Sequence, residues 1–226
     1  MTYQRPLFQP AFTLVEMLVV LAIVGLMMGI GVNSFFGYRE RQALEQTAAN
    51  LQTYIRQIQN YAKNGYRGEG DCALTSNNTV TNLALKLNYW NITYNTSTGD
   101  FEATPHCTEY EYEGAFLTQR SNSDKTGDAV IFRPALPKNY TINIIPQAQP
   151  DENLITFQTV FGETLLNYDP NNIKYIPIPN LRIVIANPDD DLGYRFYITN
   201  GGIITDGCLC TGGSACANEK DLQDQC

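Results

Sequence analysis

Six cysteines have the clearest capacity for chemistry in this sequence, and all of them follow residue 70. They are Cys72, Cys107, Cys208, Cys210, Cys216 and Cys226. The last four could bind zinc as thiolates, but the Cys-x2-Cys pairing usual in zinc sites is absent. The even number favours disulfides, whose connectivity the sequence does not determine. We expect Cys72 to pair with Cys107, closing a loop of 34 residues. The other four would hold the C-terminal tail, and a direct Cys208–Cys210 bond would be strained.

Two other groups of side chains could bind a ligand or a proton. Asp189, Asp190 and Asp191 form an acidic turn with the oxygen ligands that calcium prefers. Their spacing does not fit an EF-hand, and a solvated turn between two strands is the interpretation that we favour over a calcium site. His106 is the only histidine, and no triad of serine, histidine and acid accompanies it. We therefore expect His106 at an exposed strand end, no catalytic site and no cofactor, with calcium at the acidic turn as the lesser alternative.

Glu16 carries the only charge between Phe12 and Phe36. The rest of this stretch is Leu, Val, Ile, Met, Ala, Phe and Gly, apart from the uncharged polar residues Thr13, Asn33 and Ser34. About 20 apolar residues, each rising ~1.5 Å in a helix, cover the ~30 Å hydrocarbon core of a bilayer. A carboxylate at the edge of such a helix is unfavourable unless a partner neutralises it. The sequence therefore predicts a spanning helix in which Glu16 has a functional partner.

The order of features resembles the N-terminus of prepilins, which type IV pilins and type II secretion pseudopilins share. A short leader with one basic residue, Arg5, precedes Phe12-Thr-Leu-Val-Glu16 and the apolar stretch. The resemblance implies that a prepilin peptidase cuts between Ala11 and Phe12 and methylates the new amine of Phe12. It also implies that Glu16 neutralises the amine of a neighbouring subunit. The family usually has glycine where this chain has Ala11. A signal anchor with an incidental glutamate is the alternative.

Composition restricts the possible partners. The 226 residues include 15 Lys and Arg against 23 Asp and Glu, so the net charge is −8. Such an acidic chain is a poor candidate for general nucleic-acid binding, which needs a basic surface. Only 17% of residues are charged, and Asn, Thr, Tyr and Gly are plentiful, which suits a β-rich extracytoplasmic surface. The resemblance places this part outside the cytoplasmic membrane, where cysteines are oxidised.

A single long helix is expected over residues 12–64. Its first half, residues 12–36, would span the membrane, and its second half, residues 37–64, is amphipathic. The apolar stripe of this second half consists of Leu44, Ala48, Leu51, Ile55, Ile58 and Ala62. Asn64-Gly65 predicts the end of the helix. The stripe requires a sheet to cover it.

Short β-branched and aromatic runs predict a domain of antiparallel strands over residues 65–226. The predicted strands are 79–87, 89–95, 101–104, 107–113, 129–133, 140–145, 153–160, 163–168, 181–186, 194–199 and 202–206. We expect turns at 96–100, 161–162 and 200–202, an exposed polar loop at 120–128 and an irregular crossing at 170–180. The strands from Ile155 to Ile203 resemble the β-region of minor pseudopilins.

The predicted fold class is therefore α+β, with a leader at residues 1–11, the long helix, and a β domain whose tail is held by disulfides. The resemblance implies a structural subunit of a type IV pilus or pseudopilus. Its partners would be other pilins, prepilin peptidase, the inner-membrane assembly platform and the cytoplasmic membrane. A membrane-anchored binding or adhesion module that does not polymerise is the alternative. The choices between pilus and pseudopilus, and between major and minor subunit, stay open, as does any surface ligand.

Overall fold

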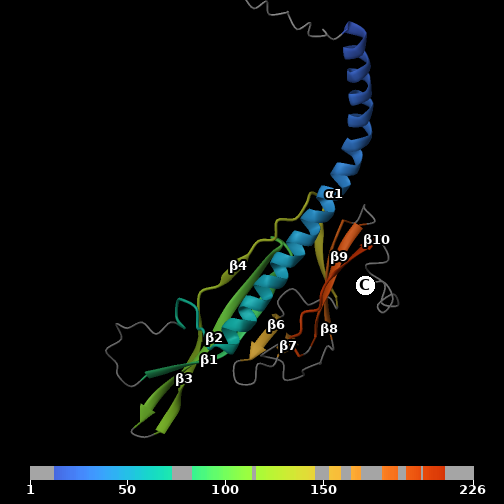
Figure 1. Ribbon diagram of the computed structural model, residues 1–226. Coiled ribbons are helices and arrows are strands. Elements are labelled where there is room, and N and C mark those ends of the chain that lie inside the picture. Colours follow the sequence, from blue (N-terminus) through green and yellow to red (C-terminus); the bar gives the residue numbers. More distant parts are fainter. Residues whose placement is uncertain are drawn as a thin grey trace, which may run out of the picture. The chain divides into compact units, whose positions relative to one another are not determined.

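The computed structural model describes residues 13–72, 83–113, 116–145, 153–158, 164–168, 180–187, 192–199 and 201–211. Some side chains within these ranges, including those of residues 30–36, lie outside the description. The chain divides into two compact units, Met1–Gln42 and Ala43–Cys226. Helix α1 belongs to both and extends from Leu14 to Lys63 (Figure 1). It is one residue shorter at its end, and two at its beginning, than the sequence predicts.

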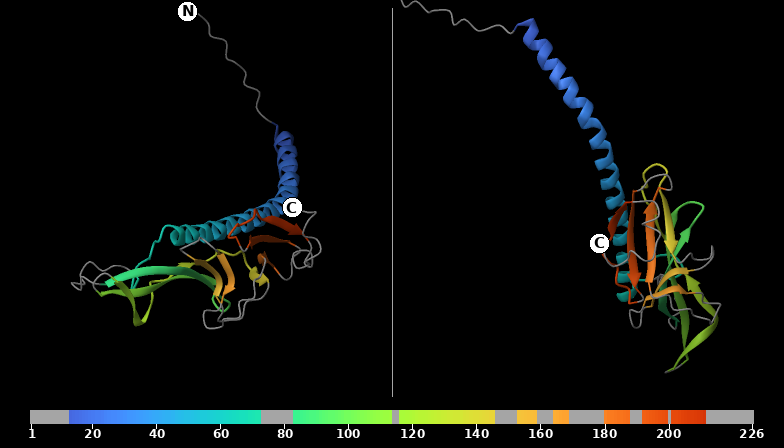
Figure 2. Two further views of the ribbon diagram at one scale, coloured as in Figure 1. Left: turned by 90° about the horizontal axis from the view of Figure 1, so that it is seen from below. Right: turned by 90° about the vertical axis from the view of Figure 1, so that its right-hand side faces the viewer.

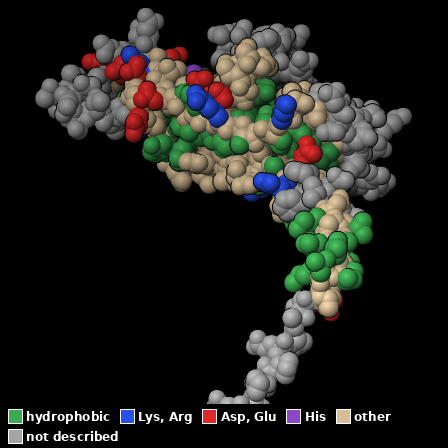
Figure 3. Space-filling view, turned by 90° about the horizontal axis from the view of Figure 1, so that it is seen from above, with side chains coloured by type: hydrophobic (Ala, Val, Ile, Leu, Met, Phe, Trp, Pro, Cys, Tyr) green, Lys and Arg blue, Asp and Glu red, His purple; other side chains and the backbone are tan. Residues whose placement is uncertain are grey.

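In the first unit, the apolar side chains of α1 are exposed. From Leu14 to Met28 the large apolar side chains are between 39% and 78% exposed. Figure 3 shows hydrophobic side chains gathered along this segment. Over the described residues, no helix combines the length and the hydropathy needed to cross a membrane. The membrane-spanning half at residues 12–36 thus stays a prediction.

In the second unit, the predicted apolar stripe of α1 is confirmed. Its six residues, from Leu44 to Ala62, are each at most 1% exposed. They pack in one core with Trp90, Phe101 and Phe196 of the strands. Figure 2 shows this part of the helix lying along the sheets. Burial of one helical face against strands is the driving force expected for such a pattern.

The described residues contain ten strands. They are β1 (Leu83–Asn95), β2 (Asp100–Glu113), β3 (Phe116–Thr126), β4 (Val130–Phe132), β5 (Thr141–Ile145), β6 (Asn153–Gln158), β7 (Thr164–Tyr168), β8 (Asn180–Ala186), β9 (Leu192–Thr199) and β10 (Cys208–Thr211). They form a six-stranded sheet of order β3-β2-β1-β6-β7, with β4 also paired to β2, and a four-stranded sheet of order β10-β9-β8-β5. All these pairings are antiparallel. The α+β class is as predicted, with two sheets covering the helix.

Three predictions of strands and one of a loop are corrected. Residues 83–95 form one strand with an irregularity between Leu87 and Tyr89, and Asp100–Glu113 continues through Pro105. The predicted polar loop at 120–128 is wrong, because β3 occupies most of it. The predicted strand at 202–206 is reduced to a single bridge between Ile198 and Ile204, and β10 follows where no strand was predicted.

The turns between strands are confirmed where the structure describes them. The β1–β2 hairpin closes at Asn95 and Asp100, and Asn95 Oδ1 accepts bonds from the N–H groups of Ser97 and Thr98 at 2.9 and 3.2 Å. Such a bond from a side chain to the backbone two residues on is an Asx turn. The predicted turn at 161–162 lies outside the described residues, and so does the predicted crossing at 170–180 except for Asn180, which begins β8.

Candidate functional site

Three hydrogen bonds join Thr13 and Glu16 at the beginning of α1. The Thr13 N–H and the Thr13 hydroxyl each donate to Glu16 Oε2 at 3.0 Å. The Glu16 N–H donates to Thr13 Oγ1 at 3.3 Å. Thr13 is thus the N-cap and Glu16 the third helical residue of a capping box, which satisfies N–H groups that a helix start leaves without partners.

The capping box gives Glu16 a role within its own chain. Its position in the first turn also suits the positive end of the helix dipole. The pairing with Thr13 was not predicted from the sequence, although the spacing Thr-x-x-Glu before an apolar run is its recognised signal. The predicted cleavage and methylation residues, Ala11 and Phe12, lie outside the described part of the chain.

The C-terminal end of α1 is fixed onto the six-stranded sheet. Gly65 has φ of +66°, its N–H donates to Ala62 O at 3.2 Å, and the Tyr66 N–H donates to Tyr61 O at 2.9 Å. This is the Schellman pattern, and it ends the helix where Asn64-Gly65 predicted an end. Trp90 Nε1 on β1 donates to Tyr66 O at 2.7 Å, and its indole is fully buried. The backbone just after the helix is therefore hydrogen-bonded to β1, a central strand of the six-stranded sheet.

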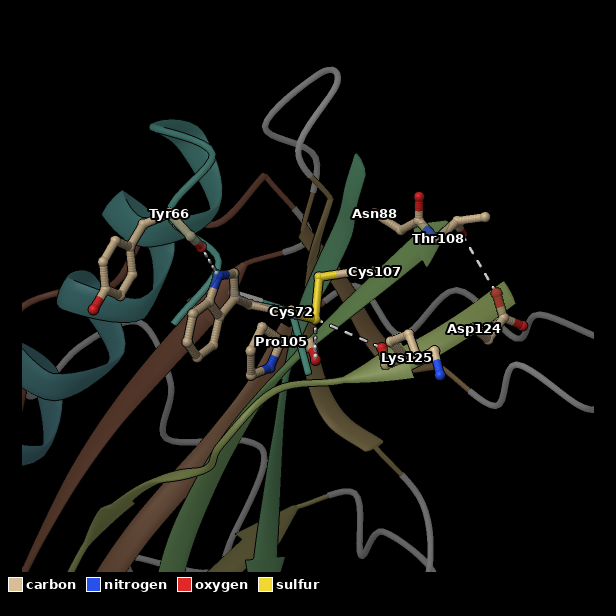
Figure 4. Close-up of a disulfide and its surroundings, with 9 residues drawn as sticks. Tyr66, Cys72, Asn88, Pro105, Cys107, Thr108, Asp124 and Lys125 are labelled. Atoms are coloured by element: carbon tan, nitrogen blue, oxygen red, sulfur yellow. Dashed lines mark hydrogen bonds between the residues drawn. A yellow bond between two sulfur atoms is a disulfide. The ribbon is translucent and has the colours of Figure 1, made fainter. Parts of the chain in front are cut away.

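A disulfide between Cys72 and Cys107 links the segment after α1 to β2, as predicted (Figure 4). Both residues are fully buried. Beside it the Gly127 N–H donates to Pro105 O at 3.0 Å, and the Asp128 N–H donates to Glu69 O at 2.9 Å. A Cβ on Gly127 would lie 2.7 Å from both Glu69 O and Pro105 Cγ, so only glycine fits. The segment is held by one covalent bond to β2 and by a backbone bond from Asp128 to Glu69.

His106 lies within β2 and is partly buried, so the predicted exposed strand end is wrong. Its ring stacks on that of Tyr89, with centroids 4.5 Å apart and an interplanar angle of 20°. Burial lowers the pKa of His106, and the charge of Asp124 acts in the opposite direction. The Thr108 hydroxyl donates to Asp124 Oδ1 at 3.4 Å and accepts a bond from the Asn88 amide (Figure 4). His106 therefore stacks on Tyr89, close to side chains of the sheet that are hydrogen-bonded to one another.

The candidate metal ligands are placed only in part. Cys208 and Cys210 lie on β10 and are both in disulfides. Cys216, Cys226 and the turn Asp189–Asp191 lie outside the described residues, so the tail pairing and the calcium site stay predictions. Among the residues that are described, no group of three or more His, Cys, Asp or Glu could hold a metal ion.

Two buried cations were not anticipated from the sequence. Arg182 on β8 is 7% exposed and Arg195 on β9 is 3% exposed. The guanidinium carbon of Arg182 lies 5.7 Å from the ring centroid of Tyr197. Their signal was an arginine inside each of two apolar, β-branched or aromatic runs, Leu181-Arg-Ile-Val-Ile and Tyr194-Arg-Phe-Tyr-Ile. Such runs indicate strands buried on both faces.

Comparison with known proteins gave a family match for an N-terminal segment only. Neither the curated proteins nor the solved structures gave a match. The resemblance of the β-region to minor pseudopilins is thus not confirmed. A scan against family models matched residues 9–32 to the family described as "Prokaryotic N-terminal methylation motif". The match contains Ala11, Phe12, Thr13 and Glu16. The chain therefore begins with a prokaryotic N-terminal methylation motif, consistent with a prepilin-type segment for cleavage and methylation.

Proposed function

We propose that this chain is a structural, non-catalytic subunit of a type IV pilus-like or pseudopilus filament. The observation that carries the proposal is the methylation motif at residues 9–32, in which Glu16 follows Phe12 by four residues. The exposed apolar surface of α1 from Leu14 to Met28 supports it. An apolar surface of that extent requires lipid or other apolar helices around it.

In this proposal a prepilin peptidase removes residues 1–11 and methylates the amine of Phe12. The stretch from residue 12 to residue 36 is then held in the cytoplasmic membrane, with the β domain outside, until the assembly platform extracts it. In the filament, the apolar halves of the helices form the interior and the β domains the surface. The uncharged sequence from Met17 to Phe36 supports this placement.

Glu16 can serve both the helix cap and a neighbouring subunit. Both bonds that its carboxylate accepts in the described structure go to Oε2. An ionised carboxylate offers about four acceptor positions on two oxygens, so Oε1 can face the cationic amine of Phe12 from an adjacent copy. That pairing neutralises the charge in the apolar interior and fixes the axial register of the subunits.

The capping box also favours a second candidate. Because Thr13 already satisfies Glu16 within one chain, the glutamate has a purpose without any neighbour. A membrane-anchored binding or adhesion module that never polymerises would keep the same box. A filament subunit needs the negative charge of Glu16, whereas an anchored module needs only its hydrogen bonds with Thr13.

Glu16→Gln separates these candidates, because glutamine keeps the hydrogen bonds of a capping box and loses the charge. We expect Glu16→Gln to reduce assembly by about tenfold or more, the factor that corresponds to losing one charge-assisted pair. Assembly is measured as the amount of protein in the sheared surface fraction and in cross-linked ladders of the membrane fraction. Thr13→Val is the matched control, since it removes the capping hydroxyl and keeps the charge.

Assembly of Glu16→Gln at the wild-type level would reject the pairing of Glu16 with a neighbouring amine. Absence of the wild-type protein from the sheared fraction, together with absence of cross-linked ladders, would reject the filament and support the anchored module. Intact mass tests processing in the same fractions. The filament proposal requires a cut, methylated form that begins at Phe12, and an uncut form in every fraction would overturn it. A processed form abundant in the sheared fraction identifies a pilin, whereas a low amount retained in the membrane identifies a minor pseudopilin.

A further inference from the structure

In the second unit, the side of α1 that is turned away from the sheets carries a positive charge without acids. Its exposed side chains recur with the period of a helix and lie opposite the buried stripe from Leu44 to Ala62. They are Gln46, Ala49, Asn50, Thr53, Arg56, Gln57, Asn60, Lys63 and Asn64. Two of these nine residues are cations and none is an acid. We call these nine residues the outer helix face.

Arg56 and Lys63 have no acidic partner on their own helix. Ion pairs on a helix surface join residues three or four positions apart. At those distances from Arg56 and Lys63 the sequence has only Gln, Thr, Asn, Tyr and Arg. Within the described residues, no ion pair joins either cation to an acid elsewhere in the fold. A helix face that stays in solvent commonly carries charges of both signs, so this face is suited to an acidic partner.

Three exposed acids lie together just beyond the end of the helix. Glu69 and Asp71 precede Cys72, and Asp128 lies beside them because its N–H donates to Glu69 O at 2.9 Å. The disulfide at Cys72 fixes this segment to β2. We call Glu69, Asp71 and Asp128 the acidic junction. In the described part of the chain, none of the three forms an ion pair.

The charges of the whole sequence are divided in the same way. Residues 46–68 contain three Lys and Arg and no acid, whereas residues 69–226 contain nine Lys and Arg against 20 Asp and Glu. Figure 3 shows acidic side chains gathered at one end of the second unit. Surfaces of opposite charge favour contact with each other, and surfaces of like charge oppose it.

Within one molecule the two surfaces form no described ion pair, since the acidic junction follows the end of the helix. Two outer helix faces would repel each other, and so would two acidic junctions. The complementary arrangement places the outer helix face of one copy against the acidic junction of another. Because this contact joins two different surfaces, it can repeat from copy to copy and build an open helical array.

We propose that the outer helix face is a docking surface for a second copy of this chain, whose acidic junction pairs with Arg56 and Lys63. The inference rests on the proposed filament function and names one contact within that filament. At about 1.5 Å per residue and about 10 Å in width, the face covers roughly 300 Å². A stable interface buries about 800 Å² per partner. The contact therefore selects and orients neighbours that the apolar half of the helix holds.

Charge reversal on the full-length chain tests the pairing. Arg56→Glu combined with Lys63→Glu sets acids against the acidic junction of the neighbour. We expect cross-linked ladders in the membrane fraction to fall by about fivefold or more, because two ion pairs are replaced by repulsion. The matched control is Lys86→Glu with Lys138→Glu, which reverses two exposed cations outside the outer helix face. This control should assemble at the wild-type level.

Restoration by a second reversal identifies the occupant. Glu69→Lys combined with Asp71→Lys should reduce the ladders as strongly as the reversal on the helix. A chain with all four substitutions should recover at least half of the wild-type assembly, because both surfaces have then exchanged sign. That recovery also shows that the substitutions are compatible with folding.

The outcomes separate this inference from the filament on which it rests. Wild-type assembly of the Arg56→Glu, Lys63→Glu chain, beside a wild type that forms ladders, would overturn the docking surface and leave the filament standing. A chain with all four substitutions that assembles no better than either pair would overturn the second copy as the occupant. A wild type that forms no ladders would reject the filament itself, and the docking surface with it.

Discussion

At the scale of single residues, Glu16 and His106 are both titratable, and the structure places them in opposite environments. Glu16 is exposed and accepts two hydrogen bonds from Thr13. His106 is partly buried against Tyr89, and burial lowers its pKa. The fold therefore favours the neutral form of the histidine, which makes its contribution to stability depend on pH.

We expect the free energy of unfolding to fall as the solution is acidified below the ordinary histidine pKa of about 6.5. Since the folded-state pKa is lowered, the unfolded chain takes up the proton first. The contribution of His106 is then complete above about pH 6.5 and is lost as the pH falls through the folded-state value. Denaturant unfolding at about pH 8 and about pH 5 measures this difference.

His106→Phe is the control for that measurement, because it keeps an aromatic ring against Tyr89 and removes the titration. The variant should lose less stability than the wild type over the same pH interval. An equal loss in both proteins would show that carboxylates elsewhere account for the acid sensitivity and that His106 contributes nothing to it.

At the scale of elements, the buried face and the end of α1 were predicted correctly because two separate sequence signals agreed. The stripe from Leu44 to Ala62 fixed the buried face, and Asn64-Gly65 fixed the end. The beginning was predicted two residues early, because the capping role of Thr13 was not recognised. Helix boundaries depend on such local bonds, and their sequence signals are short.

Strand β3 could not be recognised because its sequence lacks an apolar face. Most of residues 120–126 are polar, since β3 is an edge strand of the six-stranded sheet and pairs only with β2 among the described strands. Alternation of apolar and polar residues identifies a strand only where one face is buried. The sequence also predicted β2 as two strands, 101–104 and 107–113, on either side of Pro105. Pro105 lies between the stretch of β2 that pairs with β4 and the stretch that pairs with β3.

Gly65 is the element-scale position with the clearest mutational consequence. Its φ of +66° is in the left-handed region, where a Cβ is unfavourable by roughly 1 kcal/mol. Gly65→Ala should lower the free energy of unfolding by about that amount. Gly65→Asn should cost less, because asparagine tolerates this conformation at helix ends. Denaturant unfolding of both variants checks the order, and an alanine variant as stable as the asparagine variant would contradict it.

At the scale of the whole molecule, the Cys72–Cys107 disulfide joins the helix exit to the larger sheet. Its sequence separation of 35 residues closes a loop large enough to restrict the unfolded chain appreciably. Cys72→Ser combined with Cys107→Ser should lower the free energy of unfolding by about 2–4 kcal/mol. Both cysteines are replaced together so that no free thiol can pair with the C-terminal cysteines.

A non-reducing digest should confirm that the remaining disulfides of this variant are unchanged, and thermal unfolding in detergent then reports the loss. A change below about 0.5 kcal/mol, the size usual for surface substitutions, would mean that the backbone bonds around Gly127 hold the junction without the disulfide.

The candidate site was predictable to the extent that its signals are contiguous in sequence. The motif around Phe12 and Glu16 is one short stretch. Cys72 could be matched to Cys107 because the other four cysteines lie together near the C-terminus. The grouping of Arg182, Arg195 and Cys208 in the four-stranded sheet could not be inferred, because these residues meet only through strand register. Register is a tertiary property that a short pattern in one strand does not specify.

The same disulfide determines how this protein responds to mechanical force. When α1 is pulled away from a point beyond Cys107, the load passes through the sulfur–sulfur bond and bypasses the 34 residues between the two cysteines. At about 3.5 Å per extended residue, roughly 120 Å of chain is withheld from extension. The withheld loop contains all of β1, which lies between β2 and β6. Tension applied through the helix therefore cannot pull the central strand out of the larger sheet.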